Sequence, residues 1–383
     1  MGPPAKPAAS ASPPTAPSRN ASLSSDRETL KAEFLARHGY GDVRRQPLGG
    51  DASTRSYERL HRGEQTFIFM DQPPALETAP CPPGATPDER RALGFNAAYR
   101  LAAGRVDAFV AVAGWLRAQG LSAPEVLAAE PTLGLAVLED LGDDLYAKVI
   151  AEGGDEPLLY DAAVDALVAL HAVAPPAVLE AGGSTWPLLT YDDLALQMAQ
   201  DLFVEWLPKL KPVTFDAAAL EAWQALWSPI RARAEAGASV FCHRDYHAEN
   251  LLWLPDREGP ARVGLIDFQD AVVAHPAWDF SMLLHDARRD VSPEIEQRGL
   301  DRYLAARPDL DRTQFLADYH ALGALNIARI LGIFARLVTR DNKPKYESFM
   351  PRLWRYLDSC LADPALSGLK AWFDAHVPTE ARS

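Results

Sequence analysis

The stretch "FCHRDYHAENLLWL", residues 241–254, indicates the fold of the chain. Two apolar runs enclose a polar loop that contains His243, Arg244, Asp245 and Asn250. The β-prone residues before the loop and the "LLWL" after it predict two strands joined by this loop. An imidazole, a guanidinium, a carboxylate and an amide at one strand connection indicate catalytic machinery. The alternative is a polar loop that only caps two strands.

The segment after the loop predicts a hairpin that brings two oxygen ligands together. "EGPA" can turn the chain, and "RVGLI" can return as a strand that ends at Asp267. If the turn is centred between Glu258 and Gly259, Asn250 lies opposite Asp267. An amide and a carboxylate suit Mg²⁺, which takes oxygen ligands and retains waters and substrate phosphates. Asp245 is expected to face the same cavity, where it can accept a proton from an attacking hydroxyl.

The order of these residues, H-R-D-x-x-x-x-N followed by D-F, is typical of kinase-fold phosphotransferases. It runs here from His243 to Asn250 and continues at Asp267. We expect His243 to be a packed scaffold residue, and Arg244 to contact phosphate or form a structural ion pair. Asp279 in "HPAWDFSMLL" is expected to bond to backbone amides of the catalytic loop. Its alternative role is that of a simple acid at a helix N-terminus, where the helix dipole favours it.

Length and composition restrict the possible functions. A chain of 383 residues, 48% of them apolar, suits two lobes that share a cleft. The formal net charge of −14 argues against a nucleic-acid partner, which demands clustered Lys and Arg. No apolar run approaches the roughly 20 residues of a membrane span, so no membrane association is expected. The three widely spaced cysteines indicate a reducing cytoplasm rather than a disulfide framework.

The pattern along the chain predicts an α+β fold with a small β-rich lobe before a larger helical lobe. Residues 1–25, rich in Pro, Ala and Ser, predict a disordered tail. Residues 26–139 contain a helix and β-prone stretches and are expected to be a nucleotide-binding N-lobe, interrupted by a long excursion at 71–105. Residues 140–383 show mainly helical spacing and are expected to be a catalytic, substrate-binding C-lobe.

The first lobe lacks the usual cation of protein kinases. These enzymes pair a strand lysine with a helix glutamate, but no lysine lies between Lys31 and Lys148. Met70 stands near the expected lysine position, and the following helix, "DAFVAVAGWLRAQG", contains no glutamate. Which cation replaces the lysine is left open.

The stretch "GGDASTRSYER" offers other groups for the nucleotide phosphates. Small residues let backbone N–H groups approach phosphate oxygens. The alternative is an ordinary hairpin with solvated arginines. Main-chain groups around Glu139 and Leu141, where the lobes are expected to connect, can read an adenine edge. The nucleotide-binding residues predicted in the first stretch are Gly50, Ser53, Arg55 and Arg59.

Most of residues 30–360 resemble the aminoglycoside-phosphotransferase-like family. "HRDYHAENLLWL", "GLIDFQDAVVAHPAWDFSMLL" and "LGIFARLVTRDNKPKY" carry this resemblance. More narrowly, the chain is similar to the N-acetylmuramate/N-acetylglucosamine anomeric kinases. This similarity implies a bilobal, protein-kinase-like fold. By motif position, it implies Asp245 as the base and Asn250 and Asp267 as metal ligands.

The resemblance also implies a reaction and a metabolic setting. ATP, with Mg²⁺, would phosphorylate the C1 hydroxyl of either amino sugar in peptidoglycan recycling. A nucleotidyltransferase would then take up the product, so the two enzymes would meet only through this metabolite.

The acceptor site is less well specified by the sequence. N-acetylmuramate carries a lactyl carboxylate, and Arg329 and Arg336 lie seven residues apart, near one helical face. They are candidates to bind it, unless they pair with acids of the surface. Two other functions remain open. One is a kinase for another hydroxyl substrate, aminoglycoside- or homoserine-like, and the other is a nucleotide-binding pseudokinase that acts as a regulator.

Overall fold

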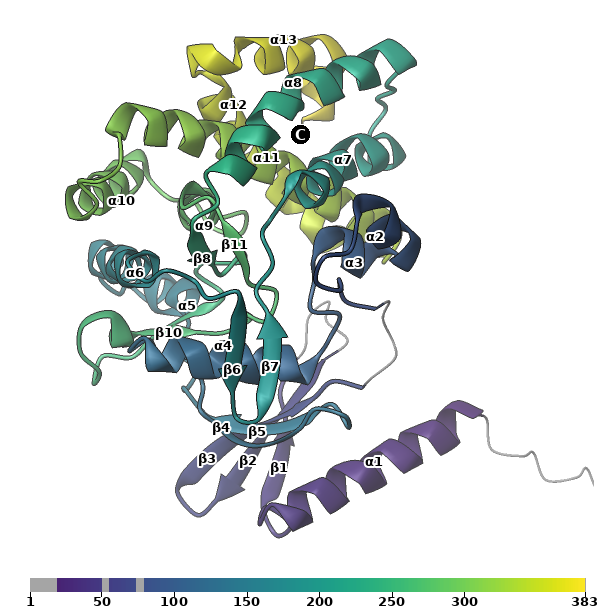
Figure 1. The fold of residues 1–383 in the computed structure, drawn as a ribbon, viewed down its shortest axis with the longest axis vertical. Helices are drawn as coiled ribbons and strands as arrows, with labels where there is room; N and C mark the ends of the chain where they lie inside the picture. Colours follow the sequence, from purple (N-terminus) through teal and green to yellow (C-terminus); the bar gives the residue numbers. More distant parts are fainter. Residues whose placement is uncertain (1–18, 50–54, 74–78, 383) are drawn as a thin grey trace, which may run out of the picture.

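A five-stranded antiparallel sheet forms the small lobe of the protein (Figure 1). The computed structural model describes residues 19–49, 55–73 and 79–382. The strands lie in the order β1-β2-β3-β5-β4. Their bounds are β1 (Arg44–Pro47), β2 (Ser56–Arg62), β3 (Gln65–Asp71), β4 (Val126–Glu130) and β5 (Leu135–Glu139).

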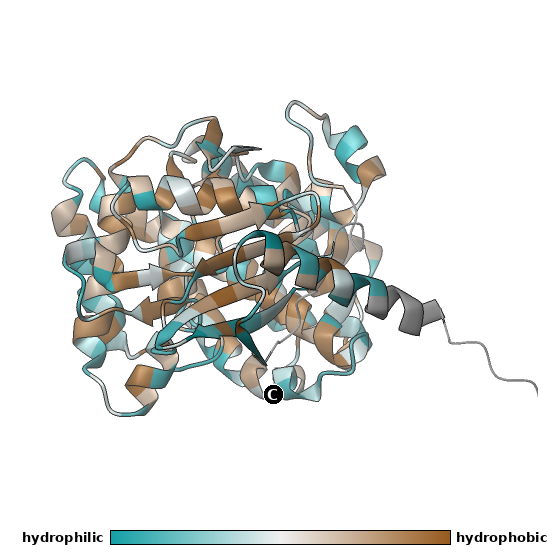
Figure 2. Ribbon diagram, turned by 90° about the horizontal axis from the view of Figure 1, so that it is seen from below, coloured by the Kyte–Doolittle hydropathy of each residue, from teal (hydrophilic) through white to brown (hydrophobic). Residues whose placement is uncertain are grey.

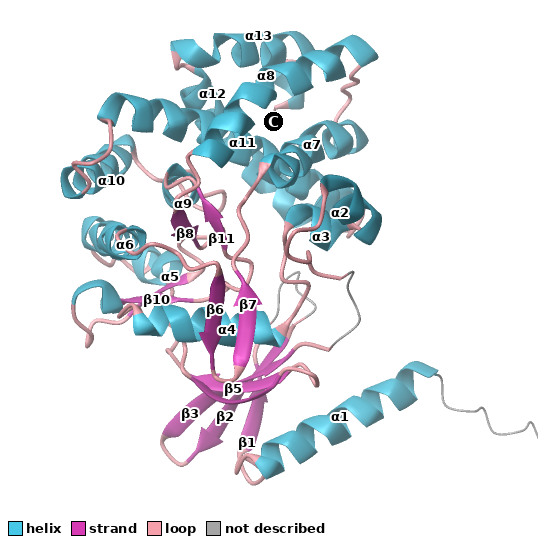
Figure 3. Ribbon diagram, in the orientation of Figure 1, coloured by secondary structure: helices cyan, strands magenta, loops and turns pink. Residues whose placement is uncertain are grey.

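The alternation of side chains along β3 and β5 explains how this sheet is covered on both faces. Phe69 and Val137 belong to an apolar cluster with α1 (Arg19–Arg37), whereas Met70 and Leu138 belong to the main core. Successive residues of a strand point to opposite faces, so each strand supplies both layers. The helix α4 (Val106–Ala118) contributes to the main core and lies between the sheet and the helical lobe (Figure 3).

The first helix begins earlier than the sequence predicted. It starts at Arg19 rather than near Asp26, so the predicted tail is wrong for residues 19–25; residues 1–18 lie outside the described part. The chain has no proline between Pro17 and Pro47, so no residue of this helix lacks the backbone N–H that helical hydrogen bonding needs. Further along α1, Arg27 donates to the Asp71 carboxylate at 2.5–3.0 Å and thereby ties the helix to the sheet.

The helical lobe is built around a pair of long helices, α7 (Asp193–Leu210) and α11 (Arg312–Thr339). Among the described residues, only α11 is long and apolar enough to cross a membrane, but 78% of its apolar window is buried inside the protein. It is therefore the core helix of this lobe. Figure 2 shows that the strands also carry hydrophobic stretches. The surrounding helices are α5 (Tyr146–Ala151), α6 (Glu156–His171), α8 (Ala217–Ala236), α9 (Ala277–Leu284), α10 (Pro293–Ala306), α12 (Met350–Leu361) and α13 (Ser367–His376).

Short strand pairs lie where the helical lobe faces the sheet. In one of them, Leu251 lies opposite Leu265, which places Asn250 against Ile266. The predicted pairing of Asn250 with Asp267 is therefore wrong by one residue, because the connection contains a 3₁₀ turn that centres the hairpin on Glu258. The pairs are β8 (Val240–Cys242) with β11 (Val272–Ala274), β9 (Leu251–Trp253) with β10 (Val263–Leu265), and β6 (Val178–Ala181) with β7 (Ser184–Pro187).

The excursion after β3 leaves the small lobe altogether. It forms α2 (Pro87–Leu93) and α3 (Phe95–Tyr99), which lie beside α7 in the helical lobe (Figure 1). Arg90 is buried and bonds to the Asp192 carboxylate, at the start of α7. The predicted N-lobe, residues 26–139, is thus not one body in space, although the bilobal α+β arrangement is confirmed.

The crossing of α7 and α11 yields a test of the fold. A Cβ added at Gly332 would lie 2.5 Å from the Leu202 carbonyl oxygen, which is backbone and cannot move aside. We expect Gly332→Ala to destabilise the protein by about 1–3 kcal/mol through overpacking, measured by denaturant unfolding.

Gly299→Ala is the matched control, since Gly299 is helical and its added Cβ would make ordinary contacts at 3.5 Å. There the better helix propensity of Ala is expected to stabilise by up to about 1 kcal/mol. Equal free energies of unfolding for the two variants would contradict the close approach of α7 and α11 at Gly332.

Candidate active site

A cleft of about 950 Å³ lies between the two lobes and receives side chains from both. Apolar residues such as Ile68, Leu138 and Ile266 line one part of it. Helices α9 and α11 line another part, with Met282 and Ile333 among their residues. The polar residues of the catalytic motif lie in the same cleft, namely Asp245, Asn250 and Asp267, together with Arg55 and Arg329.

The buried carboxylate of Asp279 holds the catalytic loop. It accepts the backbone N–H of His243 at 2.7 Å and that of Arg244 at 2.9 Å, and the Cys242 thiol donates to it at 3.2 Å. The predicted contact of Asp279 with loop amides is confirmed. Burial raises the pKa of Asp279, although these donors act in the opposite direction.

The imidazole of His243 connects the catalytic loop to the following strand. Its Nε2 lies 3.0 Å from the Ile266 carbonyl, and the Asp245 N–H donates to its Nδ1 at 3.3 Å. An accepting Nδ1 leaves the proton on Nε2, where it can bond to the carbonyl. The ring is fully buried, so the geometry is that of a scaffold residue, as predicted.

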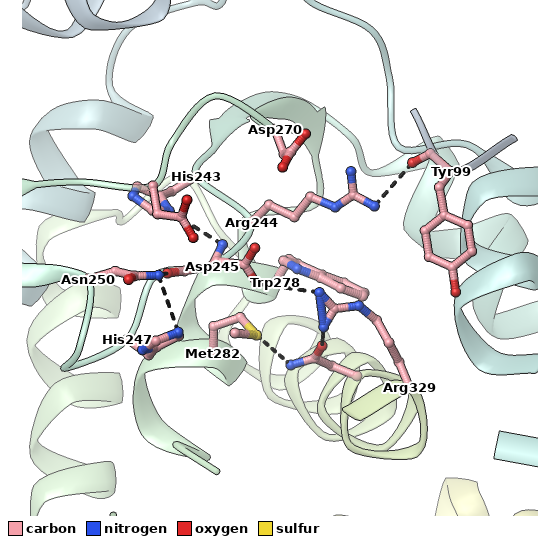
Figure 4. Close-up of polar contacts among 12 residues, drawn as sticks. Tyr99, His243, Arg244, Asp245, His247, Asn250, Asp270, Trp278, Met282 and Arg329 are labelled. Carbon is pink, nitrogen blue, oxygen red and sulfur yellow. Dashed lines mark hydrogen bonds and ion pairs between the residues drawn. The ribbon is translucent and has the colours of Figure 1, made fainter. Parts of the chain in front are cut away.

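Arg244 takes neither of its two predicted roles. Its guanidinium is buried and donates to the main-chain carbonyls of Tyr99 and Arg100 at 3.1 and 3.2 Å (Figure 4). It also lies 4.6 Å from the centre of the Tyr191 ring. Its backbone φ is +80°, a region that is costly for a residue with a Cβ, of order 1–3 kcal/mol.

Asp245 faces Arg329 across the cleft (Figure 4). One carboxylate oxygen lies 3.4 Å from the Arg329 guanidinium, which also bonds to Asn326 at 3.2 Å. The Asp245 side chain is 32% exposed, so a substrate hydroxyl can reach it. The Nε of Arg329 is buried and has no hydrogen-bond partner among the residues that the structure describes.

Asn250 and Asp267 lie in the cleft beside this acid. The Asn250 amide nitrogen donates to the Asp245 carbonyl at 2.9 Å and lies 3.2 Å from the Nε2 of His247. Burial lowers the pKa of His247 to about 4, so its ring is neutral at pH 7. Both contacts use the amide nitrogen, so the amide oxygen is the atom with which Asn250 would bind a cation.

The other predicted metal ligand, Asp267, is paired with Arg55 at 2.7 Å. Burial acts to raise the pKa of Asp267, but Arg55 and the Gln269 amide outweigh it, and the pKa falls below its usual value. Its φ of +65° turns the chain directly after Ile266. An ionised carboxylate and an amide oxygen fit Mg²⁺, which needs few protein ligands when phosphates and waters supply the others. Within the described ranges, no three His, Cys, Asp or Glu side chains cluster as a metal site.

The predicted nucleotide-binding residues have different surroundings. Gly50 and Ser53 lie outside the described residues. Arg55 lies in the cleft and bonds to Asp267, so the first lobe, which lacks the expected lysine, supplies an arginine to the cleft. Arg59 also lines the cleft, but both ends of its guanidinium are bound by Asp140 and Asp143. Its contact with nucleotide stays a prediction.

Glu139 and Leu141 line the cleft at the connection between the lobes. The Glu139 N–H donates to the Glu125 carbonyl at 2.8 Å, and its carboxylate pairs with Arg117 and Arg257. The carboxylate therefore braces the end of β5. Any contact with an adenine would be made by other main-chain groups here.

Arg336 is not among the residues that line the cleft, unlike Arg329. Its guanidinium lies 5.3 Å over the Phe95 ring of α3, and burial lowers its pKa. Residues seven apart are separated by roughly 10 Å along a helix axis, and at this distance from Arg329 the Arg336 side chain meets α3 instead of the cleft. Its role in substrate binding stays a prediction without a cleft contact.

The sequence reasoning missed several residues that line this cleft. Arg288 is the clearest case, since it pairs with Glu249 at 2.8 Å and lies 3.3 Å from His247. Tyr346 also lines the cleft, although it lies in the quoted stretch "LGIFARLVTRDNKPKY". No motif spacing marked either residue. Only the pair of arginines in "DARRD", after an apolar helix, offered a signal for Arg288.

In sequence and in fold, the chain is similar to known phosphotransferases. Residues 44–316 match the family described as the phosphotransferase enzyme family (APH). The chain is 73% identical over 360 residues to the N-acetylmuramate/N-acetylglucosamine kinase of Caulobacter vibrioides, covering 94% of this chain and 99% of that protein. It is 29% identical over 342 residues to the kinase of the same name from Pseudomonas aeruginosa, covering 86% and 88%.

Solved structures extend this likeness to the fold. Choline kinase LicA from Streptococcus pneumoniae superposes with a TM-score of 0.54 at 16% identity, covering 88% of this chain and 99% of that one. A choline/ethanolamine kinase family protein from Mesorhizobium loti has a TM-score of 0.53 at 17% identity, covering 91% and 98%. These likenesses confirm the predicted bilobal, protein-kinase-like fold.

The position of Asp245 yields a direct test of its role as the base. Asp245→Asn keeps the size of the side chain but removes its ability to accept a proton. We expect turnover to fall by about 10²–10⁴-fold, the usual contribution of general acid–base catalysis, while nucleotide affinity, measured by calorimetry, is kept. Asp256→Asn, at an exposed carboxylate outside the cleft, is the control. Turnover of Asp245→Asn close to that of the control would rule out this base.

Proposed function

The chain belongs to the phosphotransferase enzyme family that its residues 44–316 match, and on this premise we propose that it phosphorylates the anomeric C1 hydroxyl of N-acetylmuramate or N-acetylglucosamine with ATP. The observation that carries this proposal is the Asp245 carboxylate, partly exposed in the cleft and facing the Arg329 guanidinium. A base that pairs with a guanidinium in the same cleft suits a hydroxyl acceptor that also carries an anionic group. The name of the relative with 73% identity supports the choice of sugars.

In the proposed reaction, Asp245 accepts the proton of the sugar hydroxyl. The sugar oxygen bonds to the γ-phosphorus of ATP as the bond from that phosphorus to the bridging oxygen breaks, which releases ADP. Phosphoryl transfer needs mainly positioning and charge stabilisation. Arg55, next to Asp267, is placed to contribute positive charge on the nucleotide side. Asn250 and Asp267 would hold Mg²⁺, which when bound neutralises charge on phosphate oxygens.

The nucleotide is assigned to the part of the cleft nearest the sheet. Ile68, Leu138 and Ile266 provide apolar walls for a planar base. Since the Glu139 N–H is bonded to Glu125, the Glu139 carbonyl and the Leu141 N–H are the main-chain groups proposed to read the adenine edge. Both residues line the cleft.

The acceptor end of the cleft, here the part lined by Met282 and the residues after it, has charges that favour a neutral or anionic sugar over a cationic antibiotic. The described lining residues from Met282 onwards include Arg288 and Arg329 but no Asp or Glu. A polycationic aminoglycoside would meet two guanidinium groups there, each with a single carboxylate partner in the cleft, Asp245 or Glu249. We therefore assign the lactyl carboxylate of N-acetylmuramate to Arg329.

The proposed product, a sugar 1-phosphate, defines the setting. Its activated anomeric phosphate is a substrate for a nucleotidyltransferase, which would meet this enzyme only through the metabolite, in the cytoplasm, during peptidoglycan recycling. The direct test is to incubate the protein with ATP, Mg²⁺ and each amino sugar, and to record ³¹P spectra. A sugar 1-phosphate resonance is expected, whereas ATP that stays intact with both sugars would refute the proposed function.

The assignment of Arg329 predicts a change in sugar preference. Arg329→Gln should weaken selection of N-acetylmuramate over N-acetylglucosamine by about 10–100-fold in the ratio of kcat/KM, because a hydrogen-bonded charge contributes about 1.5–3 kcal/mol. The ratio is the informative quantity, since loss of the contact with Asp245 affects both sugars alike.

Arg340→Gln serves as the control, because Arg340 lies at the C-terminal end of the same helix, pairs with Asp341 and does not line the cleft. We expect its ratio to match that of the unmodified protein. An unchanged ratio in Arg329→Gln would exclude Arg329 as the carboxylate site.

A further inference from the structure

Residues 95–102, here called the bridging segment, contact four elements around the acceptor end of the cleft. The Tyr99 hydroxyl donates to the Met198 carbonyl of α7 at 2.6 Å, and Phe95 lies under Arg336 of α11. The Ala102 N–H donates to the Asp270 carboxylate at 2.6 Å, in the loop that also carries Asp267. The fourth contact is with the catalytic loop and is made by Arg244.

The contact with Arg244 closes the C-terminus of α3. The last carbonyls of a helix have no donor within the helix. Two of them, the carbonyls of Tyr99 and Arg100, each accept a hydrogen bond from the Arg244 guanidinium. The planar fork of an arginine can serve two acceptors at once, which a lysine does less well. The Arg244 side chain is buried, so these two bonds are formed away from bulk solvent.

The backbone of Arg244 makes this contact informative. At φ +80° glycine would be unstrained, whereas any residue with a Cβ is not. The loop therefore keeps a strained arginine at the position next to Asp245. The strain is offset by the bond from the Arg244 backbone N–H to Asp279 and by the contacts of its side chain with the bridging segment and Tyr191.

We propose that Arg244 is a positioning residue that fixes the bridging segment against the catalytic loop, and thereby sets the distance between Asp245 and the acceptor-binding face of α11. The effect on the sugar rests on the proposed function. α11 carries Arg329, which approaches Asp245, and also Arg336, which packs on the bridging segment. A shift of the segment thus changes the acceptor side of the cleft through α11, and affects the loop of Asp267 only through the bond between Ala102 and Asp270.

The test uses Arg244→Gly, which removes the guanidinium and also the backbone strain. We expect kcat/KM for the amino sugar to fall by about 100-fold, the cost of displacing reacting groups by roughly 1 Å, with a much smaller change in affinity for an ATP analogue. Hydrogen exchange should become faster at the Ala102 amide. Arg244→Lys, which keeps the charge but loses the fork, should give intermediate values in both measurements.

Asn342→Gly is the matched control, because Asn342 also has a positive φ, of +52°, but does not line the cleft. It should leave both kcat/KM and exchange at Ala102 unchanged. Kinetics and exchange in Arg244→Gly equal to those of this control would overturn the proposal. If Arg244→Gly does not fold, Arg244→Lys decides, and values equal to the control overturn it likewise.

The two proposals fail separately. If the unmodified protein phosphorylates neither sugar, the proposed function is wrong, yet exchange at the Ala102 amide still reports whether Arg244 holds the bridging segment. If the sugar is phosphorylated but Arg244→Gly behaves like the control, only the role of Arg244 is wrong.

Discussion

The active site depends on one buried carboxylate, that of Asp279, which receives two consecutive backbone N–H groups of the catalytic loop. Two adjacent amides can reach one carboxylate only if the chain turns sharply between them, and the positive φ of Arg244 is that turn. Each buried N–H left without an acceptor would cost about 1–3 kcal/mol. The loop therefore has one favourable conformation, in which the side chain of Arg244 points into the protein and that of Asp245 into the cleft.

From this turn the interactions extend to both lobes. On one side, Arg244 reaches the excursion from the small lobe, at Tyr99 and Arg100. On the other, the Asp245 carbonyl accepts the Asn250 amide. Arg55 of the small lobe bonds directly to Asp267 in the helical lobe, across 212 positions of the chain. The two lobes are thus connected through the residues of the motif itself, and changes in it affect both geometry and chemistry.

Local spacing was the part of this architecture that the sequence predicted well. The loop from His243 to Asn250 and the support from Asp279 follow from short-range order and strand signals. The predicted register of the hairpin was wrong by one residue, because a 3₁₀ turn and a symmetric turn have the same sequence cues. The partners of the Arg244 side chain could not be predicted from the sequence, because the excursion at 71–105 has no apolar periodicity that would place it against α7. The same holds for Arg336, whose direction depends on where α3 packs.

The charge distribution resolves an apparent conflict between an acidic protein and two anionic reactants. A net charge of −14 would repel ATP at long range. At physiological ionic strength, however, the Debye length is about 8 Å, so carboxylates elsewhere on the surface are largely screened at the cleft. Inside the cleft, screening is weaker, and Arg55, Arg288 and Arg329 are three of the cations that line it. Each has a carboxylate neighbour, respectively Asp267, Glu249 and Asp245. Without ligands the cleft is therefore close to neutral, and anionic groups of the reactants can compete with these carboxylates for guanidinium groups already held in place.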